Sequence, residues 1–138
     1  AVDANVTANA VTAILELARG KALNTTIEAT DDPSDAVDAT QFIDYLEVNI
    51  SGMNECDVVN PTADTNADSY DDAFPVLYPG KKACWDVNPV LENTTVMPTA
   101  EPQIYKAVLT VRGDGSPLDQ RDVYFLVPPE NVIITPPQ

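Results

Sequence analysis

The hydrophobic positions in the first part of the chain follow two different periods. Within residues 7–19 the apolar side chains recur at spacings of three and four, and Gly20 stands where a left-handed cap would end a helix. Residues 23–30 change to alternation, with apolar or threonine side chains at every second position. The pattern therefore predicts an amphipathic helix over 7–19 and a strand over 23–30.

A second, short helix is predicted after a turn at residues 31–35, whose sequence is Asp-Asp-Pro-Ser-Asp. Asp38 is suited to be an N-cap, and Gln41 follows three residues later, as in a capping box. Apolar side chains within residues 42–46 then supply a stripe of helical spacing. We therefore expect residues 1–48 to form a helix-strand-helix portion.

The pattern changes after Asn49, where prolines become frequent and the apolar segments become short, alternating and rich in β-branched and aromatic residues. The strands predicted from this alternation are residues 74–78, 83–87, 103–112, 121–127 and, at an edge, 132–135. Short strands separated by turns are typical of an immunoglobulin-like antiparallel β-sandwich. The expected fold class is thus α+β, with the helix-strand-helix portion at 1–48 followed by a β-sandwich module at 49–138.

Charge limits the classes of partner. The chain carries 22 acidic and 7 basic side chains, a net charge of −15. Such a surface repels nucleic acid and anionic lipid, so we expect neither as a partner and no membrane insertion. Cation binding and simple solubility outside the cell are both consistent with it. The chain starts at Ala1 without a methionine, which leads us to expect a cleaved or trimmed mature protein.

The composition also limits the chemistry, because the chain contains no histidine. Histidine is the commonest general base and transition-metal ligand, so zinc and Ser-His-Asp or Cys-His catalysis are not expected. The carboxylate pairs Asp31–Asp32 and Asp71–Asp72 are unremarkable in so acidic a chain, which argues against glycosidase chemistry. The Lys106 side chain could also form an isopeptide bond with an asparagine on a neighbouring strand. We expect no enzyme activity.

Cys56 and Cys84 are the only two cysteines. In an acidic chain rich in threonine and proline they indicate an oxidising compartment and one disulfide, for which the loop-entropy model gives about 3.6 kcal/mol. Two buried thiols are the alternative. The disulfide leads us to expect a secreted protein, either extracellular or at the cell surface.

Between the cysteines lies an acidic loop with oxygen-bearing residues at alternate positions. They match positions 1, 3, 5, 7 and 9 of a calcium-binding loop and are Asp64, Asn66, Asp68, Tyr70 and Asp72. Tyr70 would contribute its backbone carbonyl. Ser69 replaces the usual glycine and Pro75 the usual bidentate glutamate, so this is not an EF-hand. We expect calcium as the cofactor, with a solvated acidic loop as the alternative.

Four Asn-x-Ser/Thr sequons occur, and chance in a threonine-rich chain explains them as well as glycosylation does. Their asparagines are Asn5, Asn24, Asn49 and Asn93.

Several segments resemble the region that follows the von Willebrand factor type A domain in secreted or lipid-anchored proteins of myxobacteria-like bacteria. They are residues 63–68, 72–74, 79–80, 84–87, 101–103 and 121–129. The first half is similar to the end of the type A domain itself, with its terminal helix near residues 38–43. This resemblance implies a piece of a larger surface protein. The Asp-x-Ser-x-Ser motif of type A domains is absent, so adhesion through that site is not implied.

These observations together predict a non-enzymatic, calcium-stabilised extracellular module for adhesion or protein–protein contact. The alternative is a structural subunit of an extracellular filament or surface layer, which self-associates by strand exchange because residues 132–135 could complete a neighbour's sheet. A lectin-like domain is a third reading, based on Trp85 and the tyrosines.

Overall fold

The computed structural model describes residues 7–8, 12–16 and 21–130. These residues form strands and one short 3-10 helix. In chain order the elements are β1 (Thr7–Ala8), β2 (Thr12–Glu16), β3 (Leu23–Asp31), η1 (Ala39–Phe42), β4 (Ile43–Asn49), β5 (Phe74–Leu77), β6 (Lys82–Pro89), β7 (Gln103–Gly113) and β8 (Ser116–Val127).

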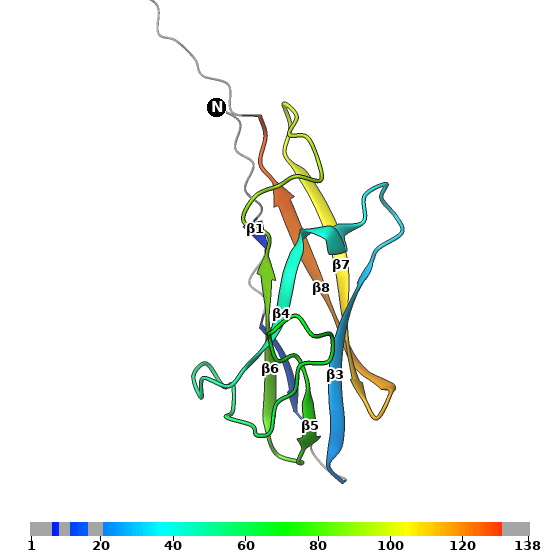
Figure 1. The fold of residues 1–138 in the computed structure, drawn as a ribbon. Coiled ribbons are helices and arrows are strands. Elements are labelled where there is room, and N and C mark those ends of the chain that lie inside the picture. Colours follow the sequence, from blue (N-terminus) through cyan, green and yellow to red (C-terminus); the bar gives the residue numbers. More distant parts are fainter. Residues whose placement is uncertain (1–6, 9–11, 17–20, 131–138) are drawn as a thin grey trace, which may run out of the picture.

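The strands form two antiparallel sheets (Figure 1). One sheet has the order β1-β8-β7-β3-β5 and the other the order β2-β6-β4. Every strand pair in both sheets is antiparallel. A chain that was expected to combine helices with strands is therefore almost entirely β within its described residues.

The hairpin of β7 and β8 is the longest pairing, as the alternation predicted. Its inward side chains on β8 are fully buried at Val123, Phe125 and Val127. Asp114 and Gly115 make the turn with φ values of 48° and 87°, a left-handed backbone that glycine adopts without strain. The turn is also tied to β3, because the backbone N–H of Asn24 donates to Asp114 Oδ1 at 2.9 Å.

The predicted strands at 23–30, 74–78 and 83–87 are confirmed as β3, β5 and β6. Alternation of buried and less buried positions in β3 puts Thr25 and Ile27 inside. Gly80, at φ 88°, turns the chain between β5 and β6. These strands were readable because each keeps a period of two with few interruptions.

Side chains of both sheets meet in one hydrophobic core. Trp85 of β6 is fully buried and meets Phe74 of β5 edge-on, with ring centroids 5.2 Å apart. Phe42, at the end of η1, is fully buried and lies 5.6 Å from Phe125 of β8. Because aromatic side chains bury large areas, these contacts between sheets supply much of the driving force for folding.

The predicted helix over residues 7–19 is wrong. Thr7–Ala8 pairs with β8 and Thr12–Glu16 pairs with β6, both as antiparallel strands. The stretch mixes helix formers with β-branched residues, so its local preference is weak and pairing with distant strands decides its conformation. The proposed cap at Gly20 lies outside the described residues.

The second predicted helix is also wrong beyond its first turn. Asp38 is the N-cap, as expected, and accepts a hydrogen bond from the backbone N–H of Thr40. The helix is a single 3-10 turn that ends at Phe42, and Ile43–Asn49 continues as strand β4. A register shift between Ile43 and Tyr45 breaks the alternation, which is why the strand resembled a helical stripe.

Two further predictions concern an edge strand and the division of the chain into two parts. The edge strand predicted at residues 132–135 lies outside the described residues. The division at residue 48 stays a prediction, although β3 pairs with both β5 and β7, so segments from either side of that point share a sheet. Within the part of the chain that is described, no helix has the length and hydrophobicity needed to cross a membrane.

Candidate functional site

The acidic loop is attached to β6 at its start. The Cys56–Cys84 disulfide predicted from the sequence is present, with Cα atoms 5.4 Å apart and both residues buried. Next to it, the backbone N–H of Asp57 donates to the carbonyl of Lys82 at 3.0 Å, and the N–H of Lys82 donates to Asp57 Oδ2 at 2.8 Å. The disulfide and these two hydrogen bonds therefore attach residues 56 and 57 of the loop to β6.

The tip of the loop is closed by a second set of contacts. Ala63 and Ala73 form an isolated antiparallel bridge, with N–H···O distances of 2.9 and 3.0 Å. Beside the bridge, Asp72 is 4% exposed, and its Oδ1 accepts hydrogen bonds from the backbone N–H and the hydroxyl of Thr65 at 2.9 and 2.8 Å. The Trp85 indole N–H donates to the carbonyl of Asp72 at 2.9 Å, which joins the bridge to the core.

Within this closed segment the backbone turns around the carboxylate of Asp64. Its oxygens accept hydrogen bonds from the N–H groups of Asn66 at 3.2 Å and Ser69 at 2.9 Å. Ala67 and Ser69 have φ values of 60° and 76°, which gives the tight curvature. Desolvation acts to raise the pKa of Asp64, but the backbone hydrogen bonds, led by that of Ser69, outweigh it and lower this pKa below its ordinary value.

The side-chain amide of Asn66 lies between two carboxylates. One amide position is 2.9 Å from Asp64 Oδ1 and 3.0 and 3.2 Å from the two oxygens of Asp68. With nitrogen at that position, the amide donates to both carboxylates. Since only acceptors surround that position, nitrogen occupies it, and the amide bridges two carboxylates that are themselves ligands of the type a hard cation takes. Asp64, Asn66 and Asp68 are thus brought together as the alternate spacing predicted.

The other two predicted ligands are placed differently. Asp72 faces Thr65 rather than Asn66, as described above. Tyr70 donates its backbone N–H to Asp68 Oδ1 at 2.9 Å, and its ring stacks on that of Tyr45 in β4. No three Asp, Glu, Cys or His side chains among the described residues gather where they could hold one ion, so the cluster consists of two carboxylates and an amide.

The sequence reasoning missed the partners of these residues. Thr65 holds Asp72, and Tyr45 holds the ring of Tyr70. A threonine seven positions before an aspartate forms no recognisable local pattern. Tyr45 lies in a stretch where the sequence predicts a helix and the structure has strand β4. Neither contact could be found before β4 was known to be a strand.

A depression next to the loop has a volume of about 410 Å³. Its lining comes from β4 and the acidic loop together and consists of Glu47, Val48, Ile50, Thr62, Ser69 and Asp71. Asp71 is held in this wall because its Oδ2 accepts the hydroxyl of Thr62 at 2.5 Å and its carbonyl accepts the N–H of Val48 at 2.8 Å. The loop therefore packs along the free edge of β4.

The remaining carboxylate pairs serve the fold separately. Asp31 accepts a hydrogen bond from the backbone N–H of Ala39 at 2.9 Å, while Asp32 forms an ion pair with Lys106 at 2.9 Å. The hydrogen bond to Asp32 is the first cause of a raised pKa for Lys106, and a charged ammonium is not a nucleophile. The structure thus gives Lys106 an electrostatic partner in place of the proposed isopeptide bond.

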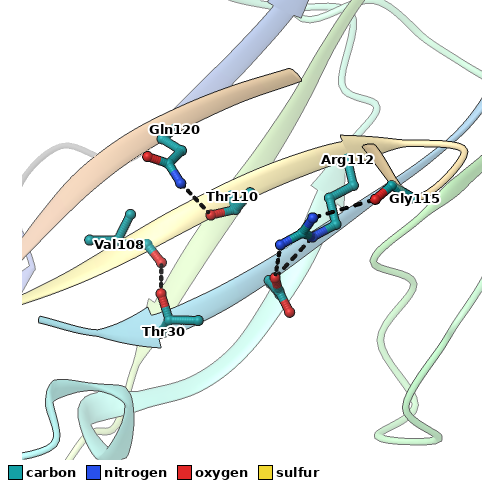
Figure 2. A network of polar contacts seen from close by, with 7 residues as sticks. Thr30, Val108, Thr110, Arg112, Gly115 and Gln120 are labelled. Atoms are coloured by element: carbon teal, nitrogen blue, oxygen red, sulfur yellow. Dashed lines mark hydrogen bonds and ion pairs between the residues drawn. The ribbon is translucent and has the colours of Figure 1, made fainter. Parts of the chain in front are cut away.

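On the outer face of the five-stranded sheet, polar side chains are satisfied by one another (Figure 2). Arg112 pairs with Glu28 at 2.8 Å and donates to the carbonyl of Gly115 at 3.4 Å, which links β7 to β3 and to the hairpin turn. Gln120 donates to the hydroxyl of Thr110 at 3.3 Å. This network joins three neighbouring strands and presents no unpaired reactive group.

The predicted glycosylation sites differ in their surroundings. Asn24 is exposed on β3. The amide of Asn49 donates to Asp86 Oδ1 at 3.3 Å, and the amide of Asn93 donates to the carbonyl of Val96. A glycan on either would displace one of these contacts, so the geometry favours Asn24. Asn5 lies outside the described residues.

Comparison with known proteins found no match: no protein-family model, no curated protein and no solved structure is similar to this chain.

Proposed function

We propose that this chain is a non-enzymatic extracellular module that binds calcium through its acidic loop and acts in adhesion or protein–protein contact. The observation that carries the proposal is the position of the Asp64 and Asp68 carboxylates on either side of the Asn66 amide, whose nitrogen donates to both at 2.9–3.2 Å. Two carboxylates and an amide oxygen are ligands of the hard type that calcium takes in groups of six to eight. Water and backbone carbonyls of the same loop would complete the shell.

The ligand set also indicates the strength of binding. Two carboxylates are few for a calcium site, and the chain supplies no bidentate glutamate near the loop tip. Extracellular calcium modules of low ligand charge bind at dissociation constants of about 10⁻⁴–10⁻³ M. We expect affinity in that range, which suits a site that is permanently filled outside a cell.

An extracellular location is supported by the disulfide and by the acidic surface. Structural disulfides persist in oxidising compartments, and here the bond attaches the proposed calcium loop to the sheet. The two antiparallel sheets with a shared core are consistent with an immunoglobulin-like sandwich. We further propose that the chain is related to the segment following type A domains in bacterial surface proteins, which the resemblance of residues 63–68 and 121–129 supports.

The direct test is binding of calcium to the oxidised protein, measured by calorimetry with magnesium as the competing ion. Replacing Asp68 by alanine should weaken calcium binding by at least tenfold, because it removes one of the two carboxylates at the site. The matched control is Glu92→Ala, which removes an exposed carboxylate outside the loop. Equal affinity of the two variants, or an absence of binding at millimolar calcium, would refute the calcium site.

A filament subunit is the second candidate, and the open edge of β8 favours it. Among the described residues, Phe125 and Leu126 of β8 pair with β1 on the side away from β7. Residues 116–123 have no strand partner on that side among the described residues. A neighbour's strand could pair there, although Pro117 lacks an N–H and Asp119 Oδ1 accepts the N–H of Gln120 at 2.9 Å, both of which weaken the edge.

Light scattering separates the two candidates. A filament subunit should grow in mass with protein concentration at millimolar calcium, and Asp122→Pro, at an exposed position in the open part of β8, should stop this growth if the mutant remains folded. A monomer at every concentration would leave the single-module proposal standing alone.

A further inference from the structure

Two tyrosine rings are in unusually close contact where the acidic loop meets the three-stranded sheet. Tyr45 comes from β4 and Tyr70 from the loop, 25 positions later in the sequence numbering. Their ring centroids are 3.6 Å apart and the ring planes are inclined by 8°. Aromatic pairs in proteins usually have centroids about 4.5–7 Å apart and an offset or edge-on arrangement. Here the two rings lie face to face.

The two phenol groups lie at the same end of this stack. The hydroxyl of Tyr70 lies close enough to that of Tyr45 to contribute to the raised pKa of Tyr45. Parallel rings with adjacent oxygens also have adjacent ortho carbons, because those carbons flank the carbon that bears the oxygen. Burial, followed by the charge of Tyr70, raises the pKa of Tyr45, so this phenol keeps its proton at neutral pH.

An oxidant can reach the pair. Tyr70 is 36% exposed and Tyr45 is partly buried beneath it, so a one-electron oxidant would meet Tyr70 first. The disulfide of Cys56 with Cys84 is held close to the same loop and indicates an oxidising environment. Exposure, contact and environment therefore coincide at one pair of side chains.

We propose that Tyr45 and Tyr70 are a modification site that forms an intramolecular dityrosine cross-link under one-electron oxidation, with a peroxide and a haem peroxidase as the oxidising system. Each phenol loses one electron and its phenolic proton to give a phenoxyl radical, whose unpaired electron is shared with the ortho carbons. The two ortho carbons form one carbon–carbon bond, and the hydrogen on each then moves to its oxygen. The protein loses two electrons and two protons, and one hydrogen peroxide takes them up to form two waters.

The cross-link would attach the loop to β4 on the side opposite its disulfide to β6. The two covalent bonds would then hold residues 56–70 between neighbouring strands, since β4 and β6 pair directly. This inference does not depend on calcium binding, because it uses only the contact between the two rings.

The test is oxidation of the folded protein with horseradish-type peroxidase and hydrogen peroxide, in dilute solution. We expect a monomer that has lost two hydrogen atoms and shows the blue fluorescence of a biphenol. After reduction of the disulfide, cleavage after glutamate at Glu47 and Glu55 separates the two tyrosines, whereas trypsin does not because no Lys or Arg lies between Lys21 and Lys81. The joined peptides should therefore be 29–47 and 56–92.

Matched variants exclude the two other tyrosines that are exposed. Tyr78 and Tyr124 are 61% and 44% exposed, so Tyr78→Phe with Tyr124→Phe serves as the reference protein and should cross-link normally. Adding Tyr45→Phe or Tyr70→Phe should reduce the intramolecular product to background, and oxidation in urea should do the same. A map of the wild-type protein in which Tyr45 and Tyr70 are unjoined, or in which only products between molecules form, would overturn the proposal without any variant.

Discussion

Individual carboxylates of the acidic loop have different roles although they lie close together in sequence. Asp64 and Asp68 flank the amide of Asn66, while Asp72 is buried and accepts two hydrogen bonds from Thr65. A buried carboxylate with satisfied oxygens contributes to stability, and removing one partner leaves buried donors without an acceptor. The proposed ion site and the structural support of the loop are therefore separate sets of residues.

Replacing Asp72 by alanine tests this separation. The change leaves the N–H and hydroxyl of Thr65 without their acceptor and should lower the free energy of unfolding by about 1–3 kcal/mol. Urea unfolding of the oxidised protein measures the effect. The exposed Asp44, changed to alanine, should alter stability by less than about 0.5 kcal/mol. Equal effects of the two substitutions would show that the hydrogen bonds to Asp72 contribute nothing.

The site could be predicted from the sequence only in part, for a reason visible at single residues. Alternate spacing placed Asp64, Asn66 and Asp68 together, since that relation is local. The positive φ angles of Ala67 and Ser69 curve the backbone around Asp64, after which Asp72 points away from the others. Its burial depends on Trp85, a contact between residues 13 positions apart that no local pattern contains.

Some strands could be predicted from the sequence and others could not. β7 and β8 could be predicted because buried apolar side chains alternate at Ala107, Leu109 and Val111 and again at Val123, Phe125 and Val127. β2 and β4 were mistaken for helices, because one has mixed local preferences and the other contains a register shift. Both are held by pairing with β6, whose paired residues lie 35 or more positions away in the sequence. Such pairing overrides a weak local propensity.

The ion pair of Asp32 and Lys106 joins the turn after β3 to β7, and its effect should depend on pH. The hydrogen bond from Lys106 is the first cause of a lowered pKa at Asp32, and the reciprocal bond raises the pKa of Lys106. The lowered pKa of Asp32 stabilises the fold at pH values above the unfolded-state carboxyl pKa of about 3.9. This stabilisation is lost as the pH falls below that value. A raised lysine pKa gives stability that is present below about 10.4 and lost as the pH rises further.

A double-mutant cycle with Asp32→Asn and Lys106→Met checks this prediction. The coupling between the two positions should be present at pH 7 and weaker at about pH 2, because Asp32 gains a proton as the pH falls through its lowered pKa. Unfolding midpoints at both pH values give the coupling directly. A coupling that persists unchanged in acid would mean that packing, and not charge, connects the two side chains.

The disulfide that attaches the loop to β6 should stabilise the fold. Replacing both Cys56 and Cys84 by alanine should cost about 2–5 kcal/mol, because the unfolded chain regains the freedom of a long loop. Urea unfolding with and without reductant provides the measurement. The double variant should be insensitive to reductant while the wild-type protein is destabilised by it. Equal urea midpoints for the wild-type protein and the double variant, each with and without reductant, would exclude a stabilising role for the disulfide.

At the scale of the whole molecule, the excess of negative charge determines which interactions count. The net charge is −15, and four of the basic side chains are each paired with a carboxylate, namely Lys82, Lys106, Arg112 and Arg121. The remaining acidic groups repel one another across a small protein, which lowers the stability of the compact state. A bound divalent cation would relieve this repulsion where Asp64 and Asp68 are closest, so the proposed site should stabilise the entire fold.

Thermal unfolding of the oxidised protein in calcium, in magnesium and in EDTA tests the central claim most directly. At a calcium concentration 100 times the dissociation constant, binding should add about 2.7 kcal/mol, which raises the midpoint by several degrees in a domain of this size. The account predicts a larger rise in calcium than in magnesium, no rise for Asp68→Ala, and a normal rise for Glu92→Ala. Identical midpoints in calcium and EDTA, or an undiminished rise in Asp68→Ala, would contradict a calcium site at Asp64, Asn66 and Asp68.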